Sequence, residues 1–202
     1  NSEAKKYSVA YPQDLTLLET MASEKCAKAI GECGVDFSYL KDLKGDDNAV
    51  TEWKQKQIDC FKFQIDLAKR VGKPLILHIR KDYMLALDIL NEMGYNGKAV
   101  FHFFKGKYDD FVEISKNDNY LFGFSNVVTY DDNMDKVIVD VPLDKLLIET
   151  DAPYVPPVSK RGEINEPKNV FYVAQKIASL KQISVEDVLK ITYDNAVKFF
   201  GV

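Results

Sequence analysis

Four side chains of types that bind divalent metal ions follow four separate apolar segments of this sequence. They are Glu32, His78, His102 and Asp151. Two imidazoles with one or two carboxylates form a workable first coordination shell for Zn²⁺, Mn²⁺ or a similar divalent ion. A metal bound by them would lower the pKa of its water and polarise an ester or phosphoryl oxygen. The predicted chemistry is therefore hydrolysis.

Each of these residues also has an ordinary structural interpretation. A single histidine is often a partly buried core residue, hydrogen-bonded to the backbone. A single carboxylate at such a place is often one that stabilises a helix terminus. The joint occurrence of all four at the ends of apolar segments favours the metal site.

The segment 146–154 indicates how such side chains are positioned. Residues 146–148 are apolar without alternation, which is typical of a strand buried on both faces. Pro153 cannot continue a central strand, so Glu149 and Asp151 are expected at the strand's carboxyl end. In α/β folds this end is where ligands bind. A surface loop that begins with an acidic pair is the alternative for this segment alone.

Strands and helices are expected to alternate along the whole chain. Apolar patterns predict strands over 6–11, 28–30, 75–78, 99–104, 120–126 and 146–148. They predict helices over 15–21, 50–71, 85–94, 108–115, 131–139, 165–177 and 184–200. Asn165 and Ser184 are expected to cap the last two of these helices. Gly31 and Gly34 are expected to allow a tight, closely packed turn around Glu32.

This alternation implies parallel strands joined by right-handed crossovers. The predicted fold class is α/β, a TIM-barrel (β/α)8-type hydrolase formed by one domain over residues 1–202. A closed barrel takes about 250 residues and has eight strands, so about two N-terminal βα units are expected to be missing. A doubly wound open sheet is the competing architecture, but no Gly-rich phosphate turn follows the first strand.

Composition narrows the class of protein. The 202 residues are 46% hydrophobic and 29% charged, as in an ordinary globular domain, and no apolar run approaches the roughly 18 residues of a membrane span. Cys26, Cys33 and Cys60 have no Cys-x-x-Cys spacing, which argues against a disulfide framework and a thiolate zinc site. A reducing, cytoplasmic location is predicted, with the nucleus or mitochondrion left open. The first residue is Asn1, so a targeting signal could have preceded it.

The charge balance limits how a phosphate-bearing substrate would be held. A formal net charge of -4 provides no general attraction to nucleic acid, so local cations or a metal must bind the phosphate. Arg80 lies two residues after His78 and is a candidate for this task. Arg161, in a polar loop, is a second candidate. Either arginine could instead be simply solvated.

Five segments together resemble the successive signatures of the TatD family of metal-dependent deoxyribonucleases. They are residues 31–36 (GECGVD), 77–80 (LHIR), 102–106 (HFFKG), 149–154 (ETDAPY) and 161–167 (RGEINEP). The resemblance runs in order over nearly the whole chain. It implies a metal-dependent TIM barrel with 3′ to 5′ exonuclease activity on single-stranded DNA, and RNA as a further substrate.

The resemblance also implies roles for the candidate residues. Glu32 would bridge two metal ions (Mg²⁺, Mn²⁺ or Zn²⁺), His78 and His102 would bind one of them, and Asp151 would bind the other. Glu32 and Asp151 would be catalytic, and Arg80 and Arg161 would bind substrate. Family members also have an N-terminal His-x-His pair, which this sequence of two histidines lacks. One metal site is therefore expected to be complete and the other incomplete.

These observations leave three interpretations. The first is a TatD-like nuclease in an N-terminally shortened form. The second is an inactive TatD-like barrel that serves as an interaction subunit, with a protein partner or a second copy covering the open side of the barrel. The third is a barrel that hydrolyses another ester, such as an aminoacyl-tRNA bond.

Overall fold

The computed structural model of the protein describes residues 12–38, 40 and 47–202. They belong to two compact units, which divide between Ala99 and Val100. The strand predicted over 6–11 lies outside the described residues. The prediction of a single domain stays a prediction.

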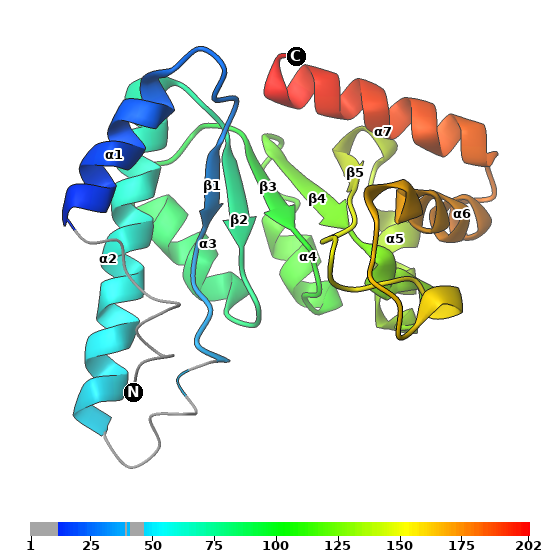
Figure 1. Ribbon diagram of the computed structural model, residues 1–202, viewed down its shortest axis with the longest axis horizontal. Coiled ribbons are helices and arrows are strands. Elements are labelled where there is room, and N and C mark those ends of the chain that lie inside the picture. Colours follow the sequence, from blue (N-terminus) through cyan, green and yellow to red (C-terminus); the bar gives the residue numbers. More distant parts are fainter. Residues whose placement is uncertain (1–11, 39, 41–46) are drawn as a thin grey trace. The chain divides into compact units, whose positions relative to one another are not determined.

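The first unit pairs two strands and packs helices on them (Figure 1). Its elements are α1 (Pro12–Ser23), β1 (Ile30–Cys33), α2 (Asp47–Val71), β2 (Leu75–His78) and α3 (Tyr83–Glu92). Strands β1 and β2 are parallel, with Ile30 opposite Leu75 and Cys33 opposite Leu77. The long helix α2 buries Phe61, Ile65, Leu67 and Ala68. The apolar face predicted for this helix is confirmed.

Strand β1 corrects the prediction of a turn around Glu32. The strand begins at Ile30 and continues through Glu32 to Cys33, with an irregularity in its register. A Cβ atom at Gly31 would lie 2.6 Å from the Cβ of Ile76, and Gly34 has a φ of +138°. The close packing expected from the two glycines is confirmed, but it brings β1 against β2 and extends the strand.

The second unit contains the remaining strands and helices. Its elements are β3 (Ala99–His102, which starts at the last residue of the first unit), α4 (Tyr108–Ile114), β4 (Tyr120–Phe124), α5 (Asp135–Asp140), β5 (Leu146–Ile148), α6 (Val170–Lys181) and α7 (Val185–Phe200). Short 3₁₀ helices occupy Asn126–Thr129, Asp132–Met134, Leu143–Lys145, Val158–Lys160 and Pro167–Asn169. The helix predicted over 131–139 is thus divided between a 3₁₀ turn and α5.

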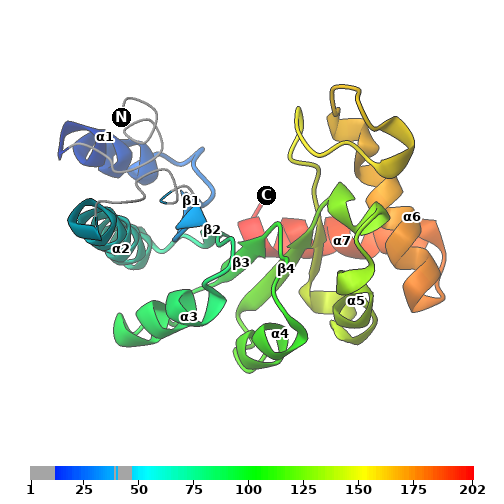
Figure 2. The ribbon, with the colours of Figure 1, turned by 90° about the horizontal axis from the view of Figure 1, so that it is seen from below.

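Strands β4 and β5 are parallel, with Gly123 opposite Leu147. All five residues of β4 are buried, as are the first two of β5, so the expected double-sided burial is confirmed. Figure 2 shows α4 and α5 on the same side of β4. Aromatic rings contact one another between β3, β4 and α4, among them Phe101, Phe104, Phe111, Tyr120 and Phe122. This core fixes the strand ends from which the polar side chains project.

Of the two helix starts predicted near the C-terminus, the structure confirms one and corrects the other. The Ser184 hydroxyl accepts a hydrogen bond from the backbone N–H of Asp187 at 3.0 Å, which confirms the predicted cap of α7. Asn165 was predicted to cap a helix, but a 3₁₀ turn begins only at Pro167, after Glu166. The Asn165 side chain is buried, and its amide forms hydrogen bonds with other parts of the chain instead. Among the described residues no helix is both long and apolar enough to cross a membrane.

Candidate metal centre

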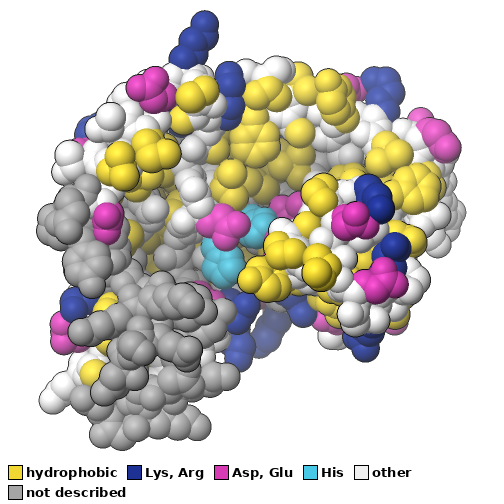
Figure 3. All heavy atoms as spheres, in the orientation of Figure 1, with side chains coloured by type: hydrophobic (Ala, Val, Ile, Leu, Met, Phe, Trp, Pro, Cys, Tyr) yellow, Lys and Arg dark blue, Asp and Glu magenta, His cyan; other side chains and the backbone are white. Residues whose placement is uncertain are grey.

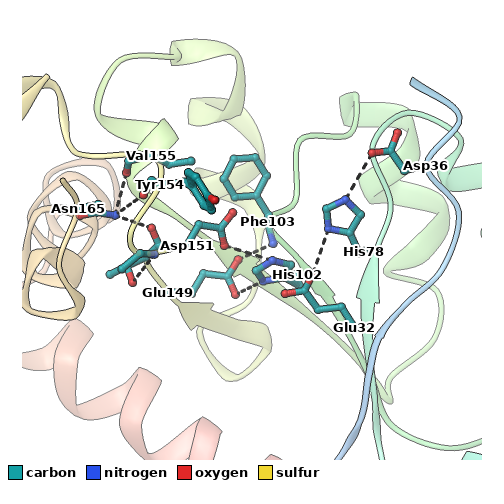
Figure 4. Close-up of polar contacts among 12 residues, drawn as sticks. Glu32, Asp36, His78, His102, Phe103, Glu149, Asp151, Tyr154, Val155 and Asn165 are labelled. Carbon is teal, nitrogen blue, oxygen red and sulfur yellow. Dashed lines mark hydrogen bonds and ion pairs between the residues drawn. The ribbon is translucent and has the colours of Figure 1, made fainter. Parts of the chain in front are cut away.

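The ends of β3 and β5 bring three potential metal ligands together in the second unit. His102 is the last residue of β3, and Glu149 and Asp151 follow β5. Each offers a ligand atom, and these atoms lie within 4.8 Å of one another. The His102 Nδ1 atom is 2.8 Å from Glu149 Oε2, and its Nε2 atom is 3.2 Å from Asp151 Oδ1 (Figure 4). An imidazole and a carboxylate, with a second carboxylate on the far side of the imidazole ring, form an arrangement that suits a divalent ion.

Contacts at the backbone N–H and at both carboxylate oxygens hold Glu149 in place. Its backbone N–H donates to the Phe124 carbonyl at 3.0 Å, and its Oε1 atom accepts a hydrogen bond from the Phe103 backbone N–H at 2.5 Å. A Cβ atom at Gly123 would lie 2.7 Å from Glu149 Oε2, so the absence of a side chain there makes room for the carboxylate. Both oxygens have partners. Glu149 therefore holds the Nδ1 side of His102 and leaves Nε2 as the donor for a metal.

Sequence reasoning placed Glu149 at the end of β5 but gave it no role. The available signal was its place beside Asp151 in the segment 149–154. What distinguishes it is the contact with His102, which the sequence pattern does not reveal. Glu149 is thus a site residue that the sequence analysis missed.

The second unit also has unusual backbone at the site. Asp151, Phe103 and Val155 have φ angles of 52°, 49° and 55°, in the left-handed region that residues other than glycine seldom adopt. Such conformations cost on the order of 1–3 kcal/mol each and persist where the surroundings hold them. The backbone around Asp151 is therefore held by specific contacts.

In the first unit, His78 lies between two carboxylates. Its Nδ1 atom is 3.3 Å from Glu32 Oε2, and its Nε2 atom is 3.7 Å from Asp36 Oδ2, an ion-pair separation longer than a hydrogen bond (Figure 4). The carboxylates of Asp36 and Glu32 raise the pKa of His78 to about 9, against the effect of partial burial. Glu32 and His78 thus lie together, and their role as metal ligands stays a prediction.

Asp36 is a second residue whose role the sequence analysis missed. Burial alone would raise its pKa, but the nearby His78 imidazole, hydrogen bonds from Ser38 and the Arg80 charge lower the pKa of Asp36 to about 2. The Ser38 N–H donates to Asp36 Oδ1 at 2.9 Å, and Gln57 bonds both the N–H and the carbonyl of Asp36. Asp36 is the last residue of the segment 31–36, so the sequence marked its position. The sequence did not show that its carboxylate lies beside His78 and Arg80.

The two arginines have different surroundings. Arg80 lies in the first unit, with its Nε atom 3.6 Å from Asp36 Oδ2 and its guanidinium donating to Ser38 Oγ at 3.2 Å. Arg161 lies in the second unit, with its guanidinium 4.7 Å from the ring centroid of Tyr130. Their roles in substrate binding stay predictions, as does one ion shared by Glu32, His78 and His102, because that set spans both units. Histidine and acidic side chains are both visible on the face in Figure 3.

Parallel strands that alternate with helices and carry histidines and carboxylates at their carboxyl ends fit a TIM-barrel-type hydrolase. The sequence model of the family described as "TatD related DNase" matches residues 3–201, and the chain belongs to this family. The expected fold class and the resemblance are confirmed.

Individual relatives are similar over most of this chain. An uncharacterized metal-dependent hydrolase of Bacillus subtilis, YabD, is 35% identical over 193 residues, which cover 94% of this chain and 71% of that protein. The human protein named deoxyribonuclease TATDN3 is 33% identical over 172 residues, 85% of this chain and 59% of that protein. The crystal structure of YjjV, a TatD homolog from Escherichia coli K12, superposes with a TM-score of 0.82 at 27% identity, covering 96% of this chain and 72% of that one.

Proposed function

We propose that this protein is a metal-dependent phosphodiesterase that removes nucleotides from the 3′ end of single-stranded DNA, with RNA as a second substrate. The observation that carries the proposal is the position of His102 between Glu149 and Asp151, at 2.8 and 3.2 Å. Membership of the TatD family and the name of the human relative support DNA as the substrate.

The residues have separate tasks in this proposal. His102 Nε2 and Asp151 would hold a divalent ion in the second unit, and Glu32 and His78 are ligand candidates in the first. When bound, the ion supplies a Lewis acid that polarises the phosphoryl oxygen and acidifies water. Glu149 keeps Nδ1 of His102 engaged, so that the imidazole presents Nε2. Arg80 and Arg161 would bind substrate phosphates, which a net charge of -4 does not attract by itself.

The test measures cleavage of single-stranded DNA labelled at its 5′ end by the metal-depleted chain after addition of Mg²⁺, Mn²⁺ or Zn²⁺. We expect a ladder of products shortened from the 3′ end. Asp151→Asn should lower the rate by more than about 100-fold, because changes to residues behind the ligands already cost about 10–100-fold. Asp144→Asn, an exposed carboxylate change in the same unit, is the matched control and should leave the rate unchanged.

Several results would contradict this proposal. A wild-type chain that binds no metal and cleaves neither DNA nor RNA would favour the inactive interaction subunit. Cleavage of an aminoacyl ester without cleavage of DNA or RNA would favour the other-ester interpretation. Equal rates for Asp151→Asn and Asp144→Asn would remove Asp151 from the site.

A further inference from the structure

Asn165 is a buried polar residue whose donor groups all face the loop that carries Asp151. Its exposed fraction is 3%, whereas the preceding Ile164 is 78% exposed. It lies between the end of β5 and the start of α6, fourteen positions after Asp151 in the sequence. An asparagine so placed must satisfy its amide within the protein.

The amide nitrogen of Asn165 faces three backbone carbonyls of this loop. Nδ2 is 2.7 Å from the carbonyl oxygens of Thr150 and Tyr154, and 3.0 Å from that of Val155 (Figure 4). The backbone N–H of Asn165 also donates to the Pro153 carbonyl at 3.0 Å. The two hydrogens of Nδ2 are shared among three carbonyls, so one residue contacts four of the six carbonyls of residues 150–155.

The other side of the amide fixes its orientation. Oδ1 accepts a hydrogen bond from the Glu166 backbone N–H at 2.9 Å and another from the Asn169 Nδ2 atom at 2.8 Å. Asn169 is itself buried. With two donors facing Oδ1, only Nδ2 can face the carbonyls, so the amide cannot turn over without loss of contacts on both sides.

These hydrogen bonds lie at the two ends of a segment with unusual backbone angles. The Thr150 carbonyl belongs to the peptide bond that leads into Asp151, whose φ is 52°, and the Val155 carbonyl belongs to a β-branched residue whose φ is 55°. Left-handed conformations at Asp and Val persist only when the surroundings determine them. The Asn165 amide bonds both ends of the strained segment 151–155.

We propose that Asn165 is the positioning residue that fixes Asp151 for binding a divalent cation. The inference rests on the proposed role of Asp151 as a metal ligand. Asn165 does not contact the ion. It acts through the backbone on each side of Asp151, so that the carboxylate is held beside His102 before the metal arrives.

A comparison of two identical chemical changes at the two ends of β5 tests this role. Asn165→Asp keeps the shape and the acceptor atoms but replaces the amide donor with an oxygen that faces carbonyls. Asn195 is the matched control, because its Nδ2 atom donates to the carbonyls of Leu143 and Leu146, at 2.7 and 2.9 Å, where β5 begins. Asn195→Asp makes the same change away from Asp151.

The measurement is Mn²⁺ binding by the metal-depleted full chain, followed by electron paramagnetic resonance, with the melting temperature recorded without metal. Asp151→Asn defines how much affinity depends on that carboxylate. We expect Asn165→Asp to weaken Mn²⁺ binding about 10–100-fold, toward the affinity of Asp151→Asn. Both asparagine variants should lower the melting temperature, but Asn195→Asp should keep the wild-type Mn²⁺ affinity.

Wild-type affinity in Asn165→Asp would overturn the inference, and so would an equal loss of affinity in Asn195→Asp. Should Asn165→Asp not fold, Asn169→Ala decides, because it removes only the donor that orients the amide and should weaken Mn²⁺ binding in the same direction. Unchanged binding in that variant also overturns the inference. A wild-type chain that binds no Mn²⁺ would instead refute the proposed function, and the inference with it.

Discussion

Each of the two histidines of this protein lies between two carboxylates, but the two arrangements differ in how firmly they are held. The His102 side chain is 12% exposed, and its contacts with Glu149 and Asp151 are 2.8 and 3.2 Å. The His78 side chain is 37% exposed, and its contacts with Glu32 and Asp36 are 3.3 and 3.7 Å. Burial and shorter distances make the His102 set the more preorganised of the two.

The protonation of His78 gives a prediction for the metal-free protein. Its folded-state pKa of about 9 lies above the unfolded value of 6.5, so the protonated form stabilises the fold. This contribution is fully present below pH 6.5 and is lost as the pH rises through about 9. Nuclear magnetic resonance of the His78 ring should show a midpoint near 9, and Asp36→Asn should lower it toward 6.5. A midpoint near 6.5 in the wild type would show that the two carboxylates do not act on this imidazole.

At this scale the sequence predicted the ligand types but not their partners. Glu32, His78, His102 and Asp151 could be selected because each follows an apolar run that periodicity reveals. Asp36, Glu149 and Asn165 act through contacts with residues that no periodic pattern connects to them. The Asn-x-Pro order at 165–167 is also a common helix start, so local reasoning assigned Asn165 to a cap.

Among the elements, β5 and α7 together determine where the Asp151 loop begins. Strand β5 is only three residues long, and α7 packs against it. Asn195 of α7 bonds the carbonyls of Leu143 and Leu146. The position of α7 is thus part of the support for the second unit, although α7 supplies no metal ligand.

The cap of α7 should therefore affect stability without affecting the site. Ser184→Ala removes the hydroxyl that bonds the Asp187 N–H, and it should lower the free energy of unfolding by about 1 kcal/mol. Ser159→Ala, at an exposed position of the same unit, is the control and should stay within about 0.5 kcal/mol. Urea denaturation measures both. A loss of Mn²⁺ affinity in the folded Ser184→Ala protein would contradict this prediction, because it would show that the α7 cap also affects the metal site.

Element boundaries were predictable where apolar runs were unbroken, as in β2, and less so where glycine permits close packing, as in β1. The sequence of 28–36 predicts a turn because Gly31 and Gly34 bracket Glu32. The structure extends the strand because the missing side chain at Gly31 lets it approach Ile76. Such a close approach depends on the neighbouring strand, which lies more than 40 residues away in the sequence.

For the whole molecule, the number of histidines bears on metal dependence. The TatD resemblance implies two ions, one of them completed by a His-x-His pair, and this 202-residue sequence has only His78 and His102. In two-metal hydrolysis one ion stabilises the attacking oxygen and the other the leaving oxygen. With one ligand set complete, as the resemblance implies, these residues should keep substrate binding better than turnover.

We accordingly expect these 202 residues to cleave single-stranded DNA slowly at low metal and faster with excess Mn²⁺, because water must supply the ligands that this stretch of sequence does not. The measurement is the exonuclease rate against Mn²⁺ concentration, for this chain and for a form extended by an N-terminal segment that bears His-x-His. The extended form should reach its full rate at lower Mn²⁺. Full activity of the 202-residue chain at low metal would show that another group within it completes the second set. Inactivity of both forms at every concentration would favour the interaction subunit, since the ligands would then be present without turnover.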